Sequence, residues 1–112
     1  MIAFAEHEFT LDLPEKTGGT RRDSYKSFKR QTGKEHPDVR GPKFPNELVY
    51  LWRHFREVHN GRAVNGYGET RVSYLDLMAW QEVTGTRLRP WEARAIMTLG
   101  MVWLNVRNSA NG

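Results

Sequence analysis

The feature of this sequence that most constrains its fold is the spacing of apolar residues in the second half of the chain. Between positions 46 and 59 they recur every three or four residues, which is the period of a helix with one buried face. The residues that carry this pattern are Leu48, Leu51, Trp52, Phe55 and Val58. We therefore expect a helix over residues 46–59 that packs this face against other elements.

Two further segments have helical signals of their own. Ser73 is followed three residues later by Asp76, a variant of the capping box that predicts a helix over 74–84, ending before Gly85. Its apolar face is assigned to Tyr74, Leu77 and Met78, with Trp80 nearby. Pro90 suits the first position of a third helix, over 90–106. The predicted core of the three helices is Leu48, Leu51, Trp52, Phe55, Leu77, Trp80, Ile96, Leu99 and Trp103.

The first part of the chain has weaker signals. Tyr25 and Phe28 lie three residues apart and Gly33 follows, which predicts a short helix near 23–32, packed against the core or tethered to it. From Phe9 to Leu13 apolar and polar residues alternate at the strand period. We therefore expect a mainly α protein with three parts: an extended arm over 1–19 whose mobility the sequence leaves open, a helical domain over 20–106, and a frayed tail over 107–112.

The composition excludes several classes of protein. The chain has no cysteine, so it has no disulfide framework, no thiolate metal site and no cysteine nucleophile. No apolar run approaches the roughly 18 residues of a membrane span, and the N-terminus lacks the basic start of a signal peptide. We expect a soluble intracellular protein without a membrane partner.

No group of residues has the spacing of a catalytic, metal or cofactor site. His54 and His59 lie five residues apart on one predicted helix, too far round it to bind the same ion. Gly61 and Gly66 have the glycine spacing of a phosphate loop, but Tyr67 stands where that loop requires lysine. The sequence therefore predicts no catalytic residue, no metal ligand and no cofactor, and we expect a protein that is not an enzyme.

The charges are distributed unevenly. Eight of the 17 lysines and arginines fall between Thr20 and Lys43, against three acidic residues. Such a stretch leaves open, as an alternative, a small basic nucleic-acid-binding or regulatory protein. The predicted helix over 90–106, however, offers Arg94 as its single cation between Trp91 and Leu104, with no Asn or Gln for base edges. Nucleic acid is therefore not an expected partner.

Aromatic and arginine residues outside the predicted core are candidates for binding another protein. All four tryptophans lie between positions 52 and 103, and Trp91 falls in the first turn of its helix, where the core explains it less well. Aromatic and arginine side chains supply much of the binding energy at protein interfaces. The candidate partner-binding residues are Arg62, Tyr67, Arg87, Arg89, Trp91 and Arg94.

Several short motifs occur in order between about residues 20 and 104. They are Arg30-Gln31-Thr32-Gly33, Gly41-Pro42, Tyr50-Leu51-Trp52 with Phe55, Gly61-Arg62 with Gly66-Tyr67-Gly68, Ser73-Tyr74, Ala79-Trp80, Thr84-Gly85 and Leu88-Arg89-Pro90-Trp91-Glu92. In this order and spacing the chain resembles the small tail assembly chaperones of long-tailed bacteriophages. Residues 1–19 have no clear counterpart in that family.

The resemblance implies a non-enzymatic assembly factor that acts in the host cytoplasm during tail morphogenesis. Its implied partners are the tape-measure protein and the tail tube protein, and an upstream chaperone product is a further candidate. A structural tail component retained in the virion is a second alternative. The sequence does not indicate the oligomeric state.

Overall fold

The computed structural model describes residues 1–15, 18–34, 36–37, 41–64, 66 and 70–111. Within these ranges the chain forms five α-helices, a short 3-10 helix and no strand. The helices are α1 (Ile2–Leu11), α2 (Arg21–Thr32), η2 (Asn46–Leu48), α3 (Val49–Gly61), α4 (Tyr74–Thr84) and α5 (Pro90–Asn111). The predicted mainly α fold is confirmed.

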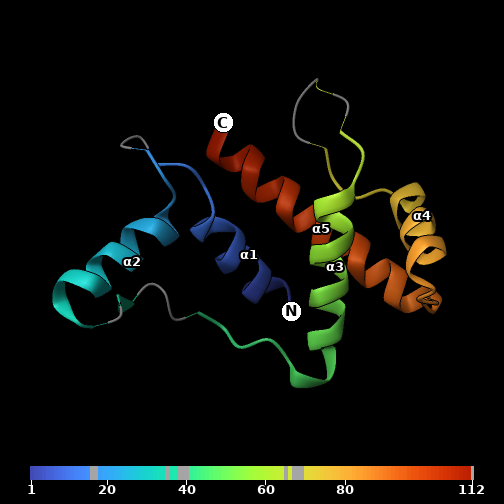
Figure 1. Ribbon diagram of the computed structural model, residues 1–112, viewed down its shortest axis with the longest axis horizontal. Coiled ribbons are helices and arrows are strands. Elements are labelled where there is room, and N and C mark those ends of the chain that lie inside the picture. Colours follow the sequence, from blue (N-terminus) through green and yellow to red (C-terminus); the bar gives the residue numbers. More distant parts are fainter. Residues whose placement is uncertain (16–17, 35, 38–40, 65, 67–69, 112) are drawn as a thin grey trace.

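The core lies where α5 crosses the other helices. Figure 1 shows α5 running across the molecule behind α3, and it contacts α1, α3 and α4. Of the residues assigned to the core, those that are buried are Leu51, Phe55, Leu77, Ile96, Leu99 and Trp103. Leu48, Trp52 and Trp80 are half-buried and pack against the same cluster. Since α5 contacts three helices, it is the element that joins the fold.

The two ends of α4 lie where the sequence predicts, whereas α3 begins at Val49 instead of 46, after the 3-10 turn η2, and α2 begins at Arg21 instead of 23. The Ser73 Oγ accepts a hydrogen bond from the Asp76 backbone N–H (3.1 Å), and the Asp76 Oδ2 accepts one from the Ser73 N–H (2.8 Å). This reciprocal pair starts α4, and Gly85, with φ of 72°, ends it in the left-handed region that suits glycine. The predicted span of α4 is therefore confirmed.

The C-terminal helix is longer than predicted. α5 continues to Asn111 instead of ending at 106. Residues 107–111 are therefore helical, where a frayed tail over 107–112 was expected. Val106 is half-buried against the core, and the Arg107 guanidinium lies over the Trp103 ring, 5.4 Å from its centroid. Arg107 and Trp103 are one turn apart, so their contact supports the helix just beyond 106, while residues 108–110 are helical and exposed.

The extended arm expected at the N-terminus is wrong, because residues 2–11 form α1. Ala5, Phe9 and Leu11 are buried, and the Phe9 ring lies 5.5 Å from the Trp52 ring and 5.7 Å from the Phe55 ring. Buried positions 5 and 9 are four residues apart, which is a helical spacing that the strand-like alternation from Phe9 onward conceals. α1 is thus part of the core.

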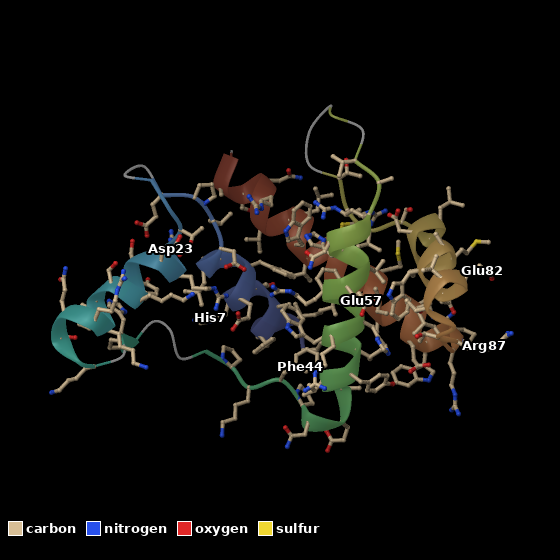
Figure 2. All side chains as sticks on the ribbon, viewed as in Figure 1. His7, Asp23, Phe44, Glu57, Glu82 and Arg87 are labelled. Atoms are coloured by element: carbon tan, nitrogen blue, oxygen red, sulfur yellow. The ribbon has the colours of Figure 1, made fainter. Side chains whose placement is uncertain are left out.

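The aromatic packing around α1 extends to the connection before α3. The Phe4 ring lies 5.1 Å from both the Phe44 ring and the Trp52 ring. Phe44, labelled in Figure 2, is half-buried in this cluster. The connection that contains Gly41, Pro42 and Pro45 is therefore anchored to the core through the ring of Phe44.

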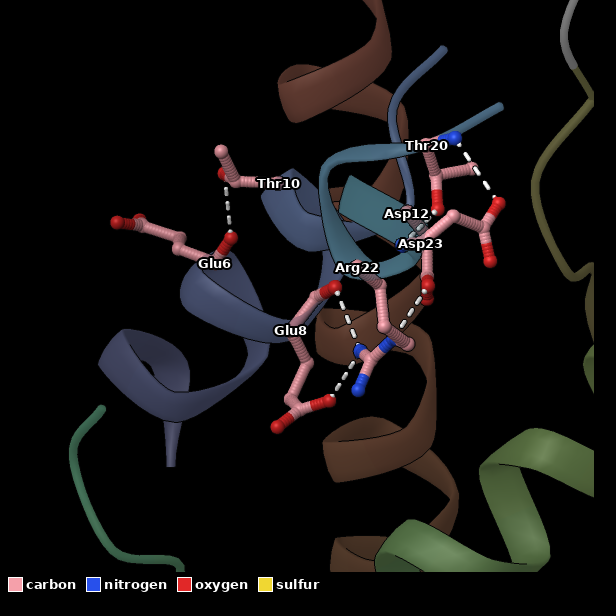
Figure 3. A network of polar contacts seen from close by, with 7 residues as sticks. All are labelled: Glu6, Glu8, Thr10, Asp12, Thr20, Arg22 and Asp23. Atoms are coloured by element: carbon pink, nitrogen blue, oxygen red, sulfur yellow. Dashed lines mark hydrogen bonds and ion pairs between the residues drawn. The ribbon is translucent and has the colours of Figure 1, made fainter. Parts of the chain in front are cut away.

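α2 projects from the core and is attached mainly at its first turn (Figure 1). It has no buried residue among its twelve. Figure 3 shows the attachment: Arg22 Nε donates to Asp12 Oδ1 (2.8 Å), and Arg22 Nη2 donates to Glu8 Oε2 (2.6 Å). Burial alone would lower the pKa of Arg22, but the bonds to these two carboxylates raise it. The predicted short helix is therefore present and tied to α1 by charged groups.

Candidate protein-binding surface

Helix α4 carries apolar side chains on two opposite faces. Its inner face holds Leu77, which is 2% exposed and belongs to the core. Its solvent-facing half, which runs from Tyr74 round to Val83 and includes Glu82, holds four apolar residues with exposed fractions of 56, 75, 64 and 85%: Tyr74, Leu75, Met78 and Val83. We call these four residues the α4 apolar face. Large apolar side chains grouped on an exposed helix surface are typical of a contact surface.

The structure corrects the assignment of Tyr74 and Met78 to the buried side of this helix. Both are exposed, and the inward positions are taken by Leu77 and the half-buried Trp80. The Trp80 ring lies 4.9 Å from the His54 ring on α3, which fixes the rotation of α4 about its axis. The outer side of α4 is apolar because the inner side is already filled.

Both ends of α4 are held to the rest of the fold by hydrogen bonds. At its start, Asp76 Oδ1 accepts from the Ala63 backbone N–H (3.1 Å). Burial alone would raise the pKa of Asp76, but the hydrogen bonds from the Ser73 and Ala63 backbone lower it. Beyond its end, the Leu88 backbone N–H donates to Gln81 Oε1 (2.8 Å). The α4 apolar face is therefore presented on a positioned helix.

Arginines lie next to the C-terminal end of the α4 apolar face. Arg87 is exposed and lines a surface hollow of about 390 Å³ together with Met78 and Glu82. Figure 2 shows Glu82 and Arg87 on the same side of the molecule, at the α4 end. Arg89 and Arg94 are exposed, and Trp91 is 46% exposed at the start of α5. Four of the six candidate partner-binding residues thus gather at the junction of α4 and α5.

The start of α5 is fixed by one carboxylate. Glu92 Oε1 accepts from the Arg89 backbone N–H (2.7 Å), and Glu92 Oε2 accepts from the Tyr50 hydroxyl (2.6 Å). The hydrogen bond from Tyr50 lowers the pKa of Glu92, and the same bond raises the pKa of Tyr50. Glu92 is therefore engaged in capping α5 and tying it to α3.

The other two candidate residues do not join this group. Arg62 lies at the opposite end of α4, where its Nη1 donates to the His59 carbonyl (2.6 Å) and its guanidinium lies 4.6 Å from the Trp103 ring centroid. Its Nε donates to the Thr70 carbonyl. Arg62 is thus built into the fold, and a role for it in partner binding stays a prediction. Tyr67 lies outside the described residues.

Two negative observations apply to the described part of the chain. In the ranges that the structure describes, no three histidine or acidic side chains gather as metal ligands would. No helix in those ranges is long and apolar enough to cross a bilayer.

The fold and this surface define a small helical protein that presents an uncovered apolar helix face beside exposed arginines and a tryptophan. The family model described as phage tail assembly chaperone matches residues 28–105, which is most of the chain. The protein therefore belongs to the phage tail assembly chaperone family, as the ordered motifs of the sequence predict. The match begins within α2, so α1 lies outside it. Searches of curated proteins and of solved structures gave no significant match.

Proposed function

We propose that this protein is a non-enzymatic tail assembly chaperone that binds the tape-measure and tail tube proteins through the α4 apolar face. The observation that carries the proposal is the exposure of Leu75, Met78 and Val83 on a helix whose opposite side is already buried in the core. Family membership supports the assignment to tail assembly.

The physical basis is the protection of apolar surface on an unassembled partner. The family resemblance implies a long helical tape-measure chain that exposes apolar stripes. A short helix can pack its apolar face against such a stripe, with contacts at every third or fourth residue. The 11 residues of α4 span roughly 16 Å, enough for about three turns of a partner helix. The chaperone therefore covers the partner one segment at a time.

The residues beside the face extend the proposed contact. Trp91 offers a large apolar side chain with a polar edge, and Arg87 and Arg89 offer planar donors for carboxylates or carbonyls. Arg94 lies one turn after Trp91 on the same helix. We propose that this work is done in the host cytoplasm before the particle is complete.

Co-expression with the two tail proteins of the same genome tests the proposal. The wild-type chain is expected to co-purify with the tape-measure protein, the tube protein or both. A variant that combines Leu75→Ser, Met78→Ser and Val83→Ser should lose this co-purification and keep its helical circular-dichroism spectrum, because these side chains are exposed.

The matched control is Val64→Ser, since Val64 is 63% exposed and lies outside α4. It should co-purify as the wild type does. Failure of the wild-type chain to bind either tail protein would refute the proposed function. Retention of binding by the triple variant would show that the contact with the tail proteins is not made by the α4 apolar face.

A further inference from the structure

A small cleft lies between α1, α3 and α5, away from the α4 apolar face. Its volume is about 150 Å³. Rings of Phe55 and Trp103 form part of its wall, and Arg56, Asn60 and Arg107 supply polar groups. Arg107 is half-buried, and Arg56 and Asn60 are exposed. Positive side chains beside an aromatic wall, in a space of this size, form a setting in which a small anion can be held.

The two arginines of the cleft are positioned by aromatic rings. The Arg107 guanidinium lies 5.4 Å from the Trp103 ring centroid, and the Arg56 guanidinium lies 5.9 Å from the Trp52 ring centroid. Stacking of this kind restricts a guanidinium without using its N–H donors. These donors therefore remain available for an acceptor that enters the cleft.

No acidic group of the described residues pairs with either arginine. The ion pairs found among those residues both belong to Arg22, which binds Glu8 and Asp12. Asp12 also lines the cleft, but its Oδ1 already accepts from Arg22 at 2.8 Å. Asp12 is thus the acidic residue of the described cleft lining, and it is already paired with Arg22.

The remaining titratable wall residue does not offset this positive charge. His59 stacks on the Phe55 ring at 5.2 Å and meets the Trp103 ring edge-on at 4.6 Å. Burial, and then the charges of Arg62, Arg56 and Arg107, lower its pKa to about 4, so it is neutral at pH 7. Arg56 and Arg107 line the same cleft as His59, so their positive charges border one small volume.

We infer that this cleft binds a carboxylate, held by Arg56 and Arg107 with Asn60 beside them. The planar fork of arginine matches the two oxygens of a carboxylate. The cleft volume of about 150 Å³ suits a carboxylate on a short carbon chain and is too small for a run of phosphates. A group with a single negative charge also suits the cleft, because the charges of Arg56 and Arg107 are not offset by Asp12, which is paired with Arg22. The source is an acidic side chain of a partner protein or a small free carboxylate.

Titration of the full chain, followed by NMR, tests the inference. The probes are a capped peptide Gly-Glu-Gly, its glutamine analogue, sodium acetate and sodium phosphate, all at one ionic strength. The signals followed are the Nε–H groups of Arg56 and Arg107 and the ring of His59. We expect saturable shifts with the glutamate peptide or acetate, and a rise in the pKa of His59 as the bound anion offsets the arginine charges.

Variants on the same helices separate the site from general attraction between charges. Arg56→Gln and Arg107→Gln should each weaken binding about ten-fold, the loss expected for one charge-assisted contact. Arg53→Gln, an exposed arginine of α3 outside the cleft, should leave binding unchanged. Backbone amide spectra of all three variants check that they fold as the wild type does.

The probes also identify the source of the carboxylate. Tighter binding of the glutamate peptide than of acetate assigns the site to an acidic protein side chain, and equal or tighter binding of acetate assigns it to a small free acid. Either result supports the carboxylate site. Shifts that do not saturate, that appear equally with the glutamine analogue or that Arg53→Gln abolishes would overturn it, as would tighter binding of phosphate than of both carboxylates.

Discussion

Replacing Phe9 with alanine tests whether α1 is an integral part of the core. Phe9 is 7% exposed and its ring packs on Trp52 and Phe55. Truncation of a buried phenylalanine to alanine costs about 3–5 kcal/mol. A domain of 112 residues has a free energy of unfolding of roughly 6–17 kcal/mol. The variant should therefore fold in buffer with much of its stability lost, whereas the same change in an undocked arm would cost almost nothing.

Urea unfolding, followed by tryptophan fluorescence and by circular dichroism, measures this cost. With a slope of about 2 kcal/mol per molar urea, a loss of ~4 kcal/mol lowers the midpoint by about 2 M. Ile2→Ala is the matched control, because Ile2 is on the same helix and 46% exposed; we expect a loss of at most about 1 kcal/mol. A Phe9→Ala loss below about 0.5 kcal/mol, or no larger than that of the control, would refute the docking of α1.

Three further changes test local features of the fold. Asp76→Asn should lower stability by about 1 kcal/mol at pH 7 through the capping box. Because the pKa of Asp76 is lowered from 3.8 in the folded state, its contribution is present above that pH, and the gap to the wild type should close as pH falls below it; a gap that persists in acid contradicts this. The folded-state pKa of His59 is about 4 against 6.5, so the free energy of unfolding should fall between pH 6.5 and 4 by an amount on the order of 1 kcal/mol after solvent screening. His59→Gln should lack this part of the pH dependence in urea titrations; an unchanged pH profile would show that His59 is not its source. Gly100→Ala should raise stability by about 1 kcal/mol, because its Cβ would lie 3.6 Å from Val72 in ordinary contact; a lower thermal midpoint would contradict this.

The sequence predicts a helix accurately where the signal lies within a few residues of the helix end. Ser73 and Asp76 bond each other across three positions, and Gly85 adopts its left-handed conformation without help from distant residues. Gly33 ends α2 in the same way, with φ of 73°. These signals are local in sequence and local in space, so reading the chain was sufficient.

Helix α1 has no such signal. Its N-cap is Met1, which makes no side-chain hydrogen bond. The helix depends on burying Ala5 in the core and on packing Phe9 against the rings of Trp52 and Phe55, which are distant in the sequence. Short helices are marginal without tertiary packing, so a local pattern alone cannot predict this one. The residues from Phe9 onward do alternate as in a strand, but the burial of Ala5 and Phe9, four residues apart, favours the helix.

The orientation of α4 was beyond sequence reasoning for a different reason. Tyr74 and Met78 have helical spacing, and so do Leu77 and Trp80, so a helical wheel offers two apolar faces and no means of choosing the buried one. The choice is made by the contact of Trp80 with His54 and by the filling of the core around Leu77. The proposed function rests on the face of α4 that stays exposed because Leu77 and Trp80 occupy the core.

Two arginines that look alike in the sequence show how surroundings assign a role. Arg62 finds two backbone carbonyls and the Trp103 ring within reach, and these acceptors hold it in the fold. Arg87 follows the end of α4 and is exposed beside Met78 and Glu82. An uncovered apolar face promotes self-association unless charge stands next to it. Under the proposed function, Arg87 would limit self-association of the α4 apolar face and would supply N–H donors to a bound partner.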